Sequence, residues 1–451
     1  MLTGAGALLA STSTASAQSA DALIDKLVEK GVLNVKEANE LREDADKNFT
    51  QAYSVKSGMP EWVNSLKLNG DFRGRFEGFY ADNPAFVDRN RWRYRLRFGV
   101  TASLLDGFEV GFRLGSGDID SYPLGGTDPI SNNQTLQNNA SKKGIFLDLA
   151  YGKYTPWNNQ NGSAAFTFGK MENPFVFSDM VFDADYTPEG FGAQAAFNLS
   201  DQHVLKLNGG AFVLDEIGGS TKDPYLFGLQ LREDAAWTKK LTSSVGIAIL
   251  DITSEETLAN PNVPNINVGN TRSANGAPTY NLNPIVADAS LTYSLDSAPL
   301  YTGAFPIRVG GDFMYNGGAP DSADNHAWSA GVTFGKAGKR KTWELAYTYK
   351  WLGANAWWEE LTDSDFGAYW KSGPPNSVGA NATAAAVAPG YYAGTDVRGH
   401  IVKFSYSPYD FLTLSAKWFY TDLVSDSFTS VPNRQGSTTM NRIQVDATLK
   451  F

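Results

Sequence analysis

Seven arginines alternate with apolar residues in three neighbouring stretches of the chain. This arginine row consists of Arg73, Arg75, Arg91, Arg93, Arg95, Arg97 and Arg113. Successive side chains of a β-strand point to opposite faces, so the alternation predicts that all seven guanidinium groups share one face of a sheet. Guanidinium groups bind carboxylate and phosphate oxygens through paired hydrogen bonds, and a row of them also creates a strong local field. Such a row could therefore bind anions, orient dipolar solutes or hold a loop in place.

A second charged stretch, almost entirely acidic, lies between residues 170 and 190. Its carboxylates are Glu172, Asp179, Asp183, Asp185 and Glu189, and Lys170 is the only basic residue. If this stretch faces the arginine row, acid on one side and base on the other would produce a field across a narrow passage. Alternatively, the arginines hold the stretch through bidentate ion pairs with its carboxylates. The sequence leaves both roles open.

Residues that could carry out catalysis are sparse. His203, His326 and His400 lie far apart in the sequence and Cys is absent, so neither a Ser/His/Asp arrangement nor a metal site is indicated. We expect no enzymatic activity and no cofactor. Asp118 and Asp120 are weak candidates for a structural Ca²⁺ in an external loop, and solvated loop acids are the alternative interpretation.

Composition limits the class of protein. The chain has 451 residues, of which 42% are hydrophobic and 13% aromatic, and its longest apolar candidate segment, Val245–Leu250, is far shorter than a spanning helix of about 20 residues. The formal charge of -10 argues against a nucleic-acid partner, because such binding depends on neutralising phosphates. Forty-four glycines and no cysteine suit a β-rich exported protein.

The elements that must position these charges are β-strands. From Pro60 to the last residue, apolar and polar side chains alternate with a period of two, as in Trp92, Tyr94, Leu96 and Phe98 between the arginines. An arginine at the centre of a bilayer costs about 2–4 kcal/mol, so the charged face must enclose water while the apolar face meets lipid. Lipid offers no hydrogen-bond partner, so the sheet must close. The pattern predicts an all-β transmembrane antiparallel barrel.

Connections between the predicted strands alternate between short and long, which is typical of outer-membrane barrels. We count about sixteen strands, an even number that puts both ends of the barrel at one rim. The acidic stretch then joins strands five and six as the third external loop. The strands around Val204–Leu214 and Leu241–Leu250 are apolar on both faces or weakly patterned. We therefore expect a packed loop or a subunit contact to cover them.

The chain divides into three predicted regions. Residues 1–17 end in Ala15-Ser16-Ala17 and are typical of a signal-peptide remnant, with an Ala/Ser-rich disordered leader as the alternative. Residues 18–60 show helical periodicity and are interpreted as a periplasmic helical or coiled-coil segment, either an oligomerisation or peptidoglycan-facing element or a solvated tail. Residues 61–451 form the barrel domain.

The last strand ends in alternating apolar residues that close with Phe451. This ending resembles the C-terminal signal by which outer-membrane proteins are recognised by the barrel assembly machinery. The alternative is an ordinary strand that happens to end in phenylalanine.

Taken together, the sequence resembles the putative-porin family of Gram-negative envelopes. The resemblance is carried by the helical segment Leu23–Lys47, the elements Glu172-Asn173-Pro174-Phe175 and Pro188-Glu189-Gly190, and the strand ending in Phe451. It implies a sixteen-stranded homotrimer in the bacterial outer membrane, in contact with lipid and lipopolysaccharide, with the third loop at the narrowest point of the channel.

The leading functional hypothesis is a water-filled channel for passive diffusion of small hydrophilic solutes and ions, narrowed where the acidic loop faces the arginine row. Two alternatives remain. The channel could select anions or oxyanions through the arginine row, or the barrel could be a non-conducting structural link between the outer membrane and the cell wall.

Overall fold

The computed structural model describes residues 59–118, 128–258, 269–273, 275–370, 390–425 and 437–451. The predicted leader, almost all of the predicted helical segment 18–60 and Asp120 lie outside these ranges. The chain divides into two compact units, one of residues 1–67 with 102–105 and one of residues 68–101 with 106–451. The second unit contains most of the barrel and all the charged residues discussed below.

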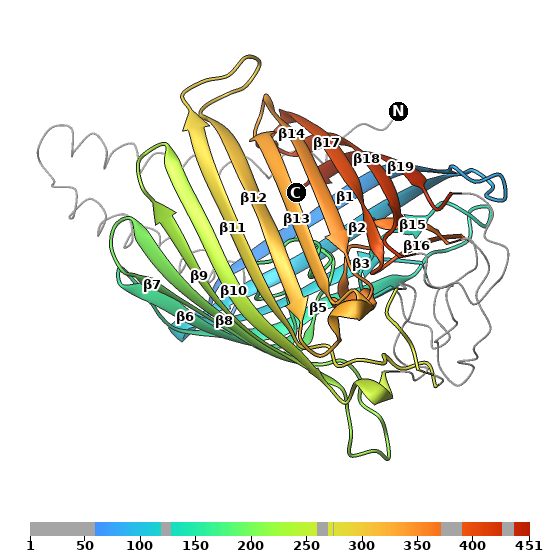
Figure 1. Cartoon of the computed structure of the whole chain (residues 1–451). Helices are drawn as coiled ribbons and strands as arrows, with labels where there is room; N and C mark the ends of the chain where they lie inside the picture. Colours follow the sequence, from blue (N-terminus) through green and yellow to red (C-terminus); the bar gives the residue numbers. More distant parts are fainter. Residues whose placement is uncertain (1–58, 119–127, 259–268, 274, 371–389, 426–436) are drawn as a thin grey trace, which may run out of the picture. The chain divides into compact units, whose positions relative to one another are not determined.

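Sixteen long antiparallel strands form one sheet, each paired with its neighbour in sequence (Figure 1). They are β1 (Val63–Ala81), β2 (Arg89–Leu104), β3 (Phe108–Ser116), β5 (Ile145–Asn159), β6 (Gly162–Lys170), β7 (Glu189–Asn198), β8 (His203–Val213), β9 (Tyr225–Ala236), β10 (Leu241–Thr253), β11 (Pro284–Leu295), β12 (Phe305–Asn316), β13 (His326–Gly335), β14 (Thr342–Leu352), β17 (Val397–Tyr409), β18 (Leu412–Leu423) and β19 (Met440–Lys450). The last strand pairs with the first, from Asp71 opposite Lys450 to Ala81 opposite Met440, and closes the barrel.

Short additional elements lie in the connections. They are β4 (Gln134–Thr135), β15 (Gly367–Trp370), β16 (Gly390–Ala393), and the 3₁₀ turns η1 (Leu105–Gly107), η3 (Glu255–Thr257), η4 (Asp321–Ala323) and η5 (Glu359–Leu361). The β4 segment pairs with β2, and β15 pairs with β16.

The predicted alternation of connection lengths is confirmed. Connections at one rim are 105–107, 160–161, 199–202, 237–240, 296–304, 336–341 and 410–411, whereas those at the other are 82–88, 117–144, 171–188, 214–224, 254–283, 317–325, 353–396 and 424–439. The short turn 105–107 needs unusual backbone geometry: Asp106 and Gly107 both have positive φ, at 57° and 79°, a region that glycine adopts without steric penalty. The predicted sixteen-stranded antiparallel barrel is therefore confirmed.

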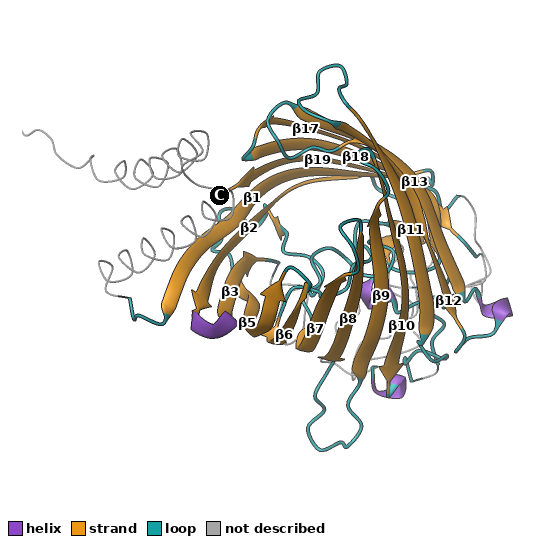
Figure 2. Cartoon of the chain, turned by 90° about the vertical axis from the view of Figure 1, so that its left-hand side faces the viewer, coloured by secondary structure: helices purple, strands orange, loops and turns teal. Residues whose placement is uncertain are grey.

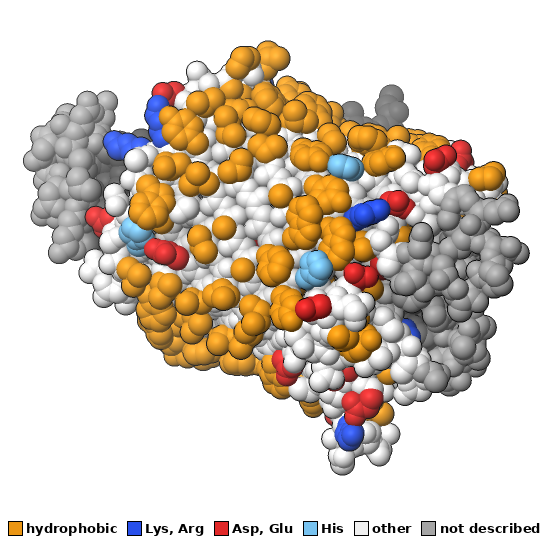
Figure 3. All heavy atoms as spheres, viewed as in Figure 1, with side chains coloured by type: hydrophobic (Ala, Val, Ile, Leu, Met, Phe, Trp, Pro, Cys, Tyr) orange, Lys and Arg blue, Asp and Glu red, His pale blue; other side chains and the backbone are white. Residues whose placement is uncertain are grey.

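The outward face is apolar, as the alternation predicted. Along β10, Val245, Ile247 and Ile249 are about half exposed, whereas the intervening Ala248 and Leu250 are buried inside. Figure 3 shows hydrophobic side chains spread over the outer surface of the strands, with acidic and basic groups gathered toward the two ends. Among the residues that the structure describes, no helix is long and apolar enough to cross a membrane.

The seam of the barrel includes the terminal residue. The backbone amide of Gly70 donates to the carbonyl of Phe451 at 2.9 Å, and the Phe451 amide donates to Gly70 at 3.1 Å. The ring of Phe451 lies over Gly70, where any larger side chain would collide with it. Whether Phe451 also acts as an assembly signal stays a prediction.

The two faces give a matched pair of substitutions. Val309→Arg on β12 places a cation toward lipid, whereas Thr333→Arg, on the neighbouring β13, places one in the water-facing interior. We expect Val309→Arg to lower the free energy of unfolding by about 2–4 kcal/mol. Thr333→Arg should change it by less than about 1 kcal/mol. Urea titration of the protein in lipid vesicles measures both, and equal losses would contradict the assignment of the faces.

Candidate functional site

The third external loop, residues 171–188 (loop 3), joins the fifth and sixth barrel strands, β6 and β7, as predicted. It folds into the barrel rather than away from it, and Figure 2 shows loop segments inside the ring of strands. The tip is fully enclosed, since Met180 and Val181 are 1% and 0% exposed. The loop therefore narrows the interior.

Loop 3 is fixed on one side by apolar packing. Its Phe175, Met180 and Phe182 join a buried cluster with inward side chains of β8 to β10, including Phe212 and Leu250. The rings of Phe175 and Phe212 meet edge to face, with their centroids 6.0 Å apart. This contact explains why the strands around 204–214 and 241–250 are apolar on both faces: a packed loop covers their inner side.

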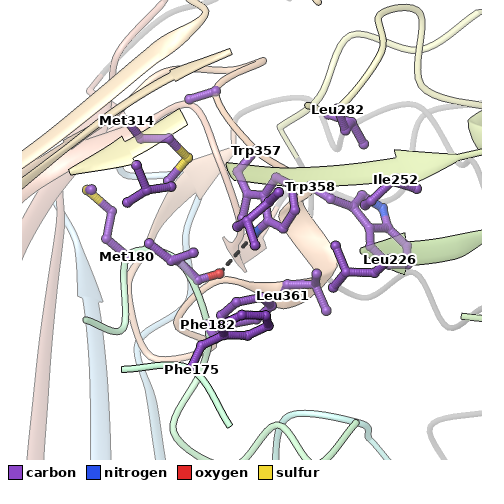
Figure 4. Packing of buried hydrophobic residues seen from close by; sticks show 14 of the residues in the cluster. Phe175, Met180, Phe182, Leu226, Ile252, Leu282, Met314, Trp357, Trp358 and Leu361 are labelled. Carbon is purple, nitrogen blue, oxygen red and sulfur yellow. Dashed lines mark hydrogen bonds between the residues drawn. The ribbon is translucent and has the colours of Figure 1, made fainter. Parts of the chain in front are cut away.

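A second loop, residues 353–396 (loop 7), of which the structure describes 353–370 and 390–396, also enters the barrel with residues 353–370. Figure 4 shows Trp357 of loop 7 beside Phe182 of loop 3. The Trp357 indole nitrogen donates to the Val181 carbonyl at 2.9 Å, and the Ser364 amide donates to Asp183 at 2.9 Å. Loops 3 and 7 thus pack as one unit inside the barrel.

Sequence reasoning did not identify loop 7 as part of the site. The residues that matter are Trp357, Asp363 and Asp365, which lie in a long connection without strand periodicity. The adjacent pair Trp357-Trp358 is the one local signal, because two consecutive large aromatics are unusual in an exposed loop.

On the other side of loop 3, Asp185 binds the arginine row. Arg95 and Arg97 on β2 donate to Asp185 at 2.9 and 3.2 Å. The same two arginines also contact Asp71 on β1, at 3.0 and 2.6 Å. Glu172, at the start of loop 3, pairs with Arg113 on β3, which also pairs with Asp148 on β5. The row therefore contacts the acidic loop directly.

The rest of the row surrounds Glu77, which is completely buried. Arg91 contacts Glu77 at 2.5 Å, and Arg75 and Arg93 also lie within ion-pair distance of it. Arg442 on β19, which the sequence analysis did not single out, donates to Glu77 at 2.9 Å. Arg442 and Arg75 both reach Asp365 of loop 7, at 2.7 and 3.1 Å. The arginine row therefore also holds loop 7.

The two remaining sequence candidates near the row have polar partners. Arg73 donates to the side-chain oxygen of Asn133 at 2.6 Å. Asp118 accepts hydrogen bonds from Gln134, from Thr135 and from Arg93. In the described part of the chain no group of three or more acidic or histidine side chains is arranged to hold a metal ion. A Ca²⁺ site at Asp118 and Asp120 stays a prediction, because Asp120 lies outside the described residues.

The charges on this side of the barrel balance. Seven arginines share ion pairs with eight carboxylates, and Arg73 makes the eighth cation. The arginines are Arg75, Arg91, Arg93, Arg95, Arg97, Arg113 and Arg442, and the carboxylates are Asp71, Glu77, Asp118, Asp148, Glu172, Asp185, Asp365 and Asp446. The arginine row, Arg442 and these eight carboxylates thus form a network with no net formal charge.

The other predicted loop acids lie elsewhere. Asp179 reaches across the barrel to Lys350 on β14 at 2.5 Å, and Lys350 also binds Asp363 at 3.1 Å. Glu189 begins β7 at the rim, where it is mostly exposed and pairs with Lys170. Asp183 accepts from the amides of Asp185 and Ser364, at 2.8 and 2.9 Å. Four of the five loop acids therefore secure loop 3, and Glu189 does not.

The two buried loop carboxylates Asp183 and Asp185 have pKa values shifted in opposite directions. Burial and the neighbouring Asp185 and Asp363 raise the pKa of Asp183 well above its usual range. Burial also opposes ionisation of Asp185, but Arg95 and Arg97 outweigh it and lower the pKa of Asp185. Asp185 is the carboxylate that binds the arginine row, and at neutral pH it stays ionised.

An open cavity of about 420 Å³ remains beside loop 3, on the side away from the arginine row. Residues 176–179 of loop 3 form one wall. Inward side chains of β9, β11 to β14, β17 and β18 form the other, and they include Arg232, Arg308, Lys350, Lys403 and Lys417. The sequence analysis did not single out these cations, because each is isolated on its strand.

Part of the chain matches a known protein family. Residues 80–282 match the family model described as "Putative porin". This match confirms the resemblance stated above and spans β2 to the end of loop 5. A search of the curated proteins finds no sequence that matches this chain.

One solved structure shares the fold with a TM-score above 0.5. The high-pH structure of Pseudomonas putida OprB has 9% sequence identity and a TM-score of 0.51, covering 89% of this chain and 96% of that one. The outer membrane channel DcaP of Acinetobacter baumannii has 13% identity and a TM-score of 0.43, covering 86% of this chain and 97% of that one. The likeness to OprB supports the barrel fold and nothing finer.

The family match and the apolar belt place this porin-type barrel in the bacterial outer membrane, in contact with its lipids. The family model that matches residues 80–282 describes porins, so this match points to a channel.

Asp185→Asn tests how loop 3 is held. It removes a charged partner of Arg95 and Arg97, and a hydrogen bond to a charged group contributes about 1.5–3 kcal/mol. We expect amides of residues 181–186 to exchange with deuterium roughly ten- to a hundredfold faster, measured by mass spectrometry in detergent. Glu189→Gln, which removes the rim carboxylate, is the control and should leave exchange unchanged.

The pH dependence has a definite sign. A lowered pKa in the folded state means that the Asp185 ion pairs stabilise loop 3 fully above the ordinary Asp pKa of about 3.9 and are lost as pH falls through the lowered value. The protection of residues 181–186, corrected for the pH dependence of the intrinsic exchange rate, should therefore fall below about pH 4 in the wild type but change little in Asp185→Asn. Equal pH profiles would contradict this role.

Proposed function

We propose that the protein is a diffusion channel for small hydrophilic solutes and ions, in which solutes pass between loop 3 and the wall formed by β9 to β18. The proposal rests mainly on one observation: loop 3 is bound to both sides of the barrel yet leaves a water-accessible cavity beside it. Loops that served only to seal the barrel would have no reason to leave such a space lined with charged side chains.

The arginine row acts in this proposal as a support for loops 3 and 7. Six of its seven members share carboxylates in an ion-pair network, and an arginine engaged bidentately by buried carboxylates is a poor site for a passing solute. The balanced charge also weakens any field across the passage from this side. The pairing therefore favours the holding role over direct contact with solutes.

The remaining features of the proposal follow the family resemblance. We include a homotrimer, insertion by the barrel assembly machinery through the strand ending in Phe451, and contact with peptidoglycan through the segment 18–60. The fold likeness to porins supports the trimer only indirectly.

A non-conducting structural barrel is the competing function. The alternative is weakened by the open cavity, but conductance decides between the two. In planar lipid bilayers the purified protein should give discrete conductance steps. A barrel that inserts, shown by resistance to protease, but carries no current would contradict the proposal.

Trp357→Ala tests whether the two loops set the size of the passage. Trp357 is fully buried against Val181 and Phe182, and removing such a side chain typically costs about 3–5 kcal/mol of local packing. We expect larger neutral sugars to enter liposomes several-fold faster relative to small ones, in a swelling assay. Trp237→Ala, which removes an exposed tryptophan on a short turn, should leave the size dependence unchanged.

A further inference from the structure

The cavity beside loop 3 contains a row of cations that the loops do not use. The strand register places Arg308 opposite Thr333, Thr333 opposite Ala346, Ala346 opposite Lys403, and Lys403 opposite Lys417. All of these side chains line the cavity. Arg308, Lys403 and Lys417, which we call the cavity cations, therefore lie along a single line across five adjoining strands and point into the same space.

The row contains no acid. Beyond Arg308 it continues to Thr292 on β11, and beyond Lys417 to Gln444 on β19. Within the described part of the chain, neither Arg308 nor Lys417 has a carboxylate within ion-pair distance. Lys417 contacts the Phe419 ring at 5.7 Å, and Lys403 pairs with Glu344 at 2.8 Å. In the arginine row, by contrast, six of the seven members pair with carboxylates.

Two of the cavity cations are held close together. Residues directly opposite on antiparallel strands have Cβ atoms about 4.5–5.5 Å apart, and like charges at that distance repel. Lys403 and Lys417 occupy such a pair of positions. Only Lys403 has a carboxylate partner, Glu344. An anion bound between the ammonium groups would offset the repulsion, so the unliganded arrangement favours uptake of negative charge.

The acids that do line the cavity are already engaged. Asp179 binds Lys350, Asp288 binds Arg232 at 2.7 Å, and Asp312 accepts from Ser329 at 2.6 Å. Glu344 pairs with Lys403, and Asp363 pairs with Lys350. When these two carboxylates are counted with the acids that line the cavity, acids and bases around it are equal in number. What distinguishes the cavity cations is therefore their position in the open cavity, where two of them, Arg308 and Lys417, have no carboxylate within ion-pair distance among the described residues.

We propose that the cavity cations form a binding site for an oxyanion group carried by a small polar solute. Arg308 supplies a planar set of donors suited to paired oxygens, Lys403 and Lys417 supply point charges, and Thr333 and Thr348 offer hydroxyls in the same lining. Glycine and alanine at 310, 331 and 346 leave the space that the solute would occupy. The inference rests on the proposed function, since solutes reach this site only if the barrel is open to water.

The test uses full-length protein and inorganic phosphate as the probe. The variant R308Q/K403Q/K417Q removes the three cavity charges, and K239Q/K336Q/K339Q removes three exposed charges from short turns, so the change in net charge is matched. Calorimetric titration of detergent-solubilised protein at constant ionic strength should show saturable phosphate binding. The first variant should weaken it at least about tenfold, and the second should not change it.

Two further measurements keep the outcomes separate. Circular dichroism and protease resistance establish that each variant is folded, and K403R/K417R, which keeps the charges, should retain phosphate binding within about threefold. In planar bilayers the chloride-to-potassium permeability ratio should fall at least about twofold in the first variant alone.

Phosphate binding that is absent in the wild type, or equal in R308Q/K403Q/K417Q and the wild type, overturns the oxyanion site even if the channel conducts. Phosphate binding that depends on the cavity cations in a barrel without conductance supports the site and overturns the diffusion function instead.

Discussion

Closure of the sheet is the constraint on which the rest of the structure depends. Hydrocarbon offers no partner for a backbone amide or carbonyl, so β19 must return to β1, and the register from Asp71 to Ala81 completes that pairing. Once the sheet is closed, one face meets lipid and the other meets water. Successive side chains of a strand point alternately to these two faces. The same alternation that turns Val309 toward lipid turns Arg308 inward, so the charged interior follows directly from closure.

An interior lined by so many charges must keep them hydrated or pair them. The structure pairs them on one side: Glu77 is completely buried because Arg75, Arg91, Arg93 and Arg442 surround it. Breaking one partner of a buried pair commonly costs about 3–5 kcal/mol, because the other charge is left without compensation. The network therefore determines where loops 3 and 7 lie, since Asp185 and Asp365 complete it. On the opposite side Arg308, Lys403 and Lys417 remain accessible, and that side keeps the open cavity.

Most of the fold could be predicted from the sequence, because a period of two, sustained over sixteen strands, is a strong signal. The alternation along the strand also predicted that Arg93 and Arg95 point inward. Counting the connections placed Asp185 in the third loop. Loop 7 could not be predicted, because Trp357 and Asp365 reach their partners through tertiary packing that leaves no periodic trace. The cavity cations were missed for a related reason: Arg308, Lys403 and Lys417 are separated by up to 109 positions in sequence, and only the register aligns them.

The contrast between the two walls explains why the most conspicuous basic motif is a poor guide to solute binding. Arginines at every second position of one strand repel one another unless carboxylates separate them, so a dense row requires matching acids such as Asp71, Glu77 and Asp185. A solute can gain little from cations that already have partners. On the other wall, Arg308 and Lys417 have no carboxylate within ion-pair distance in the described part of the chain, so their charge stays available. Arginines that are densely spaced in the sequence therefore mark structural ion pairing here. Cations that align across neighbouring strands mark the surface that a solute would meet.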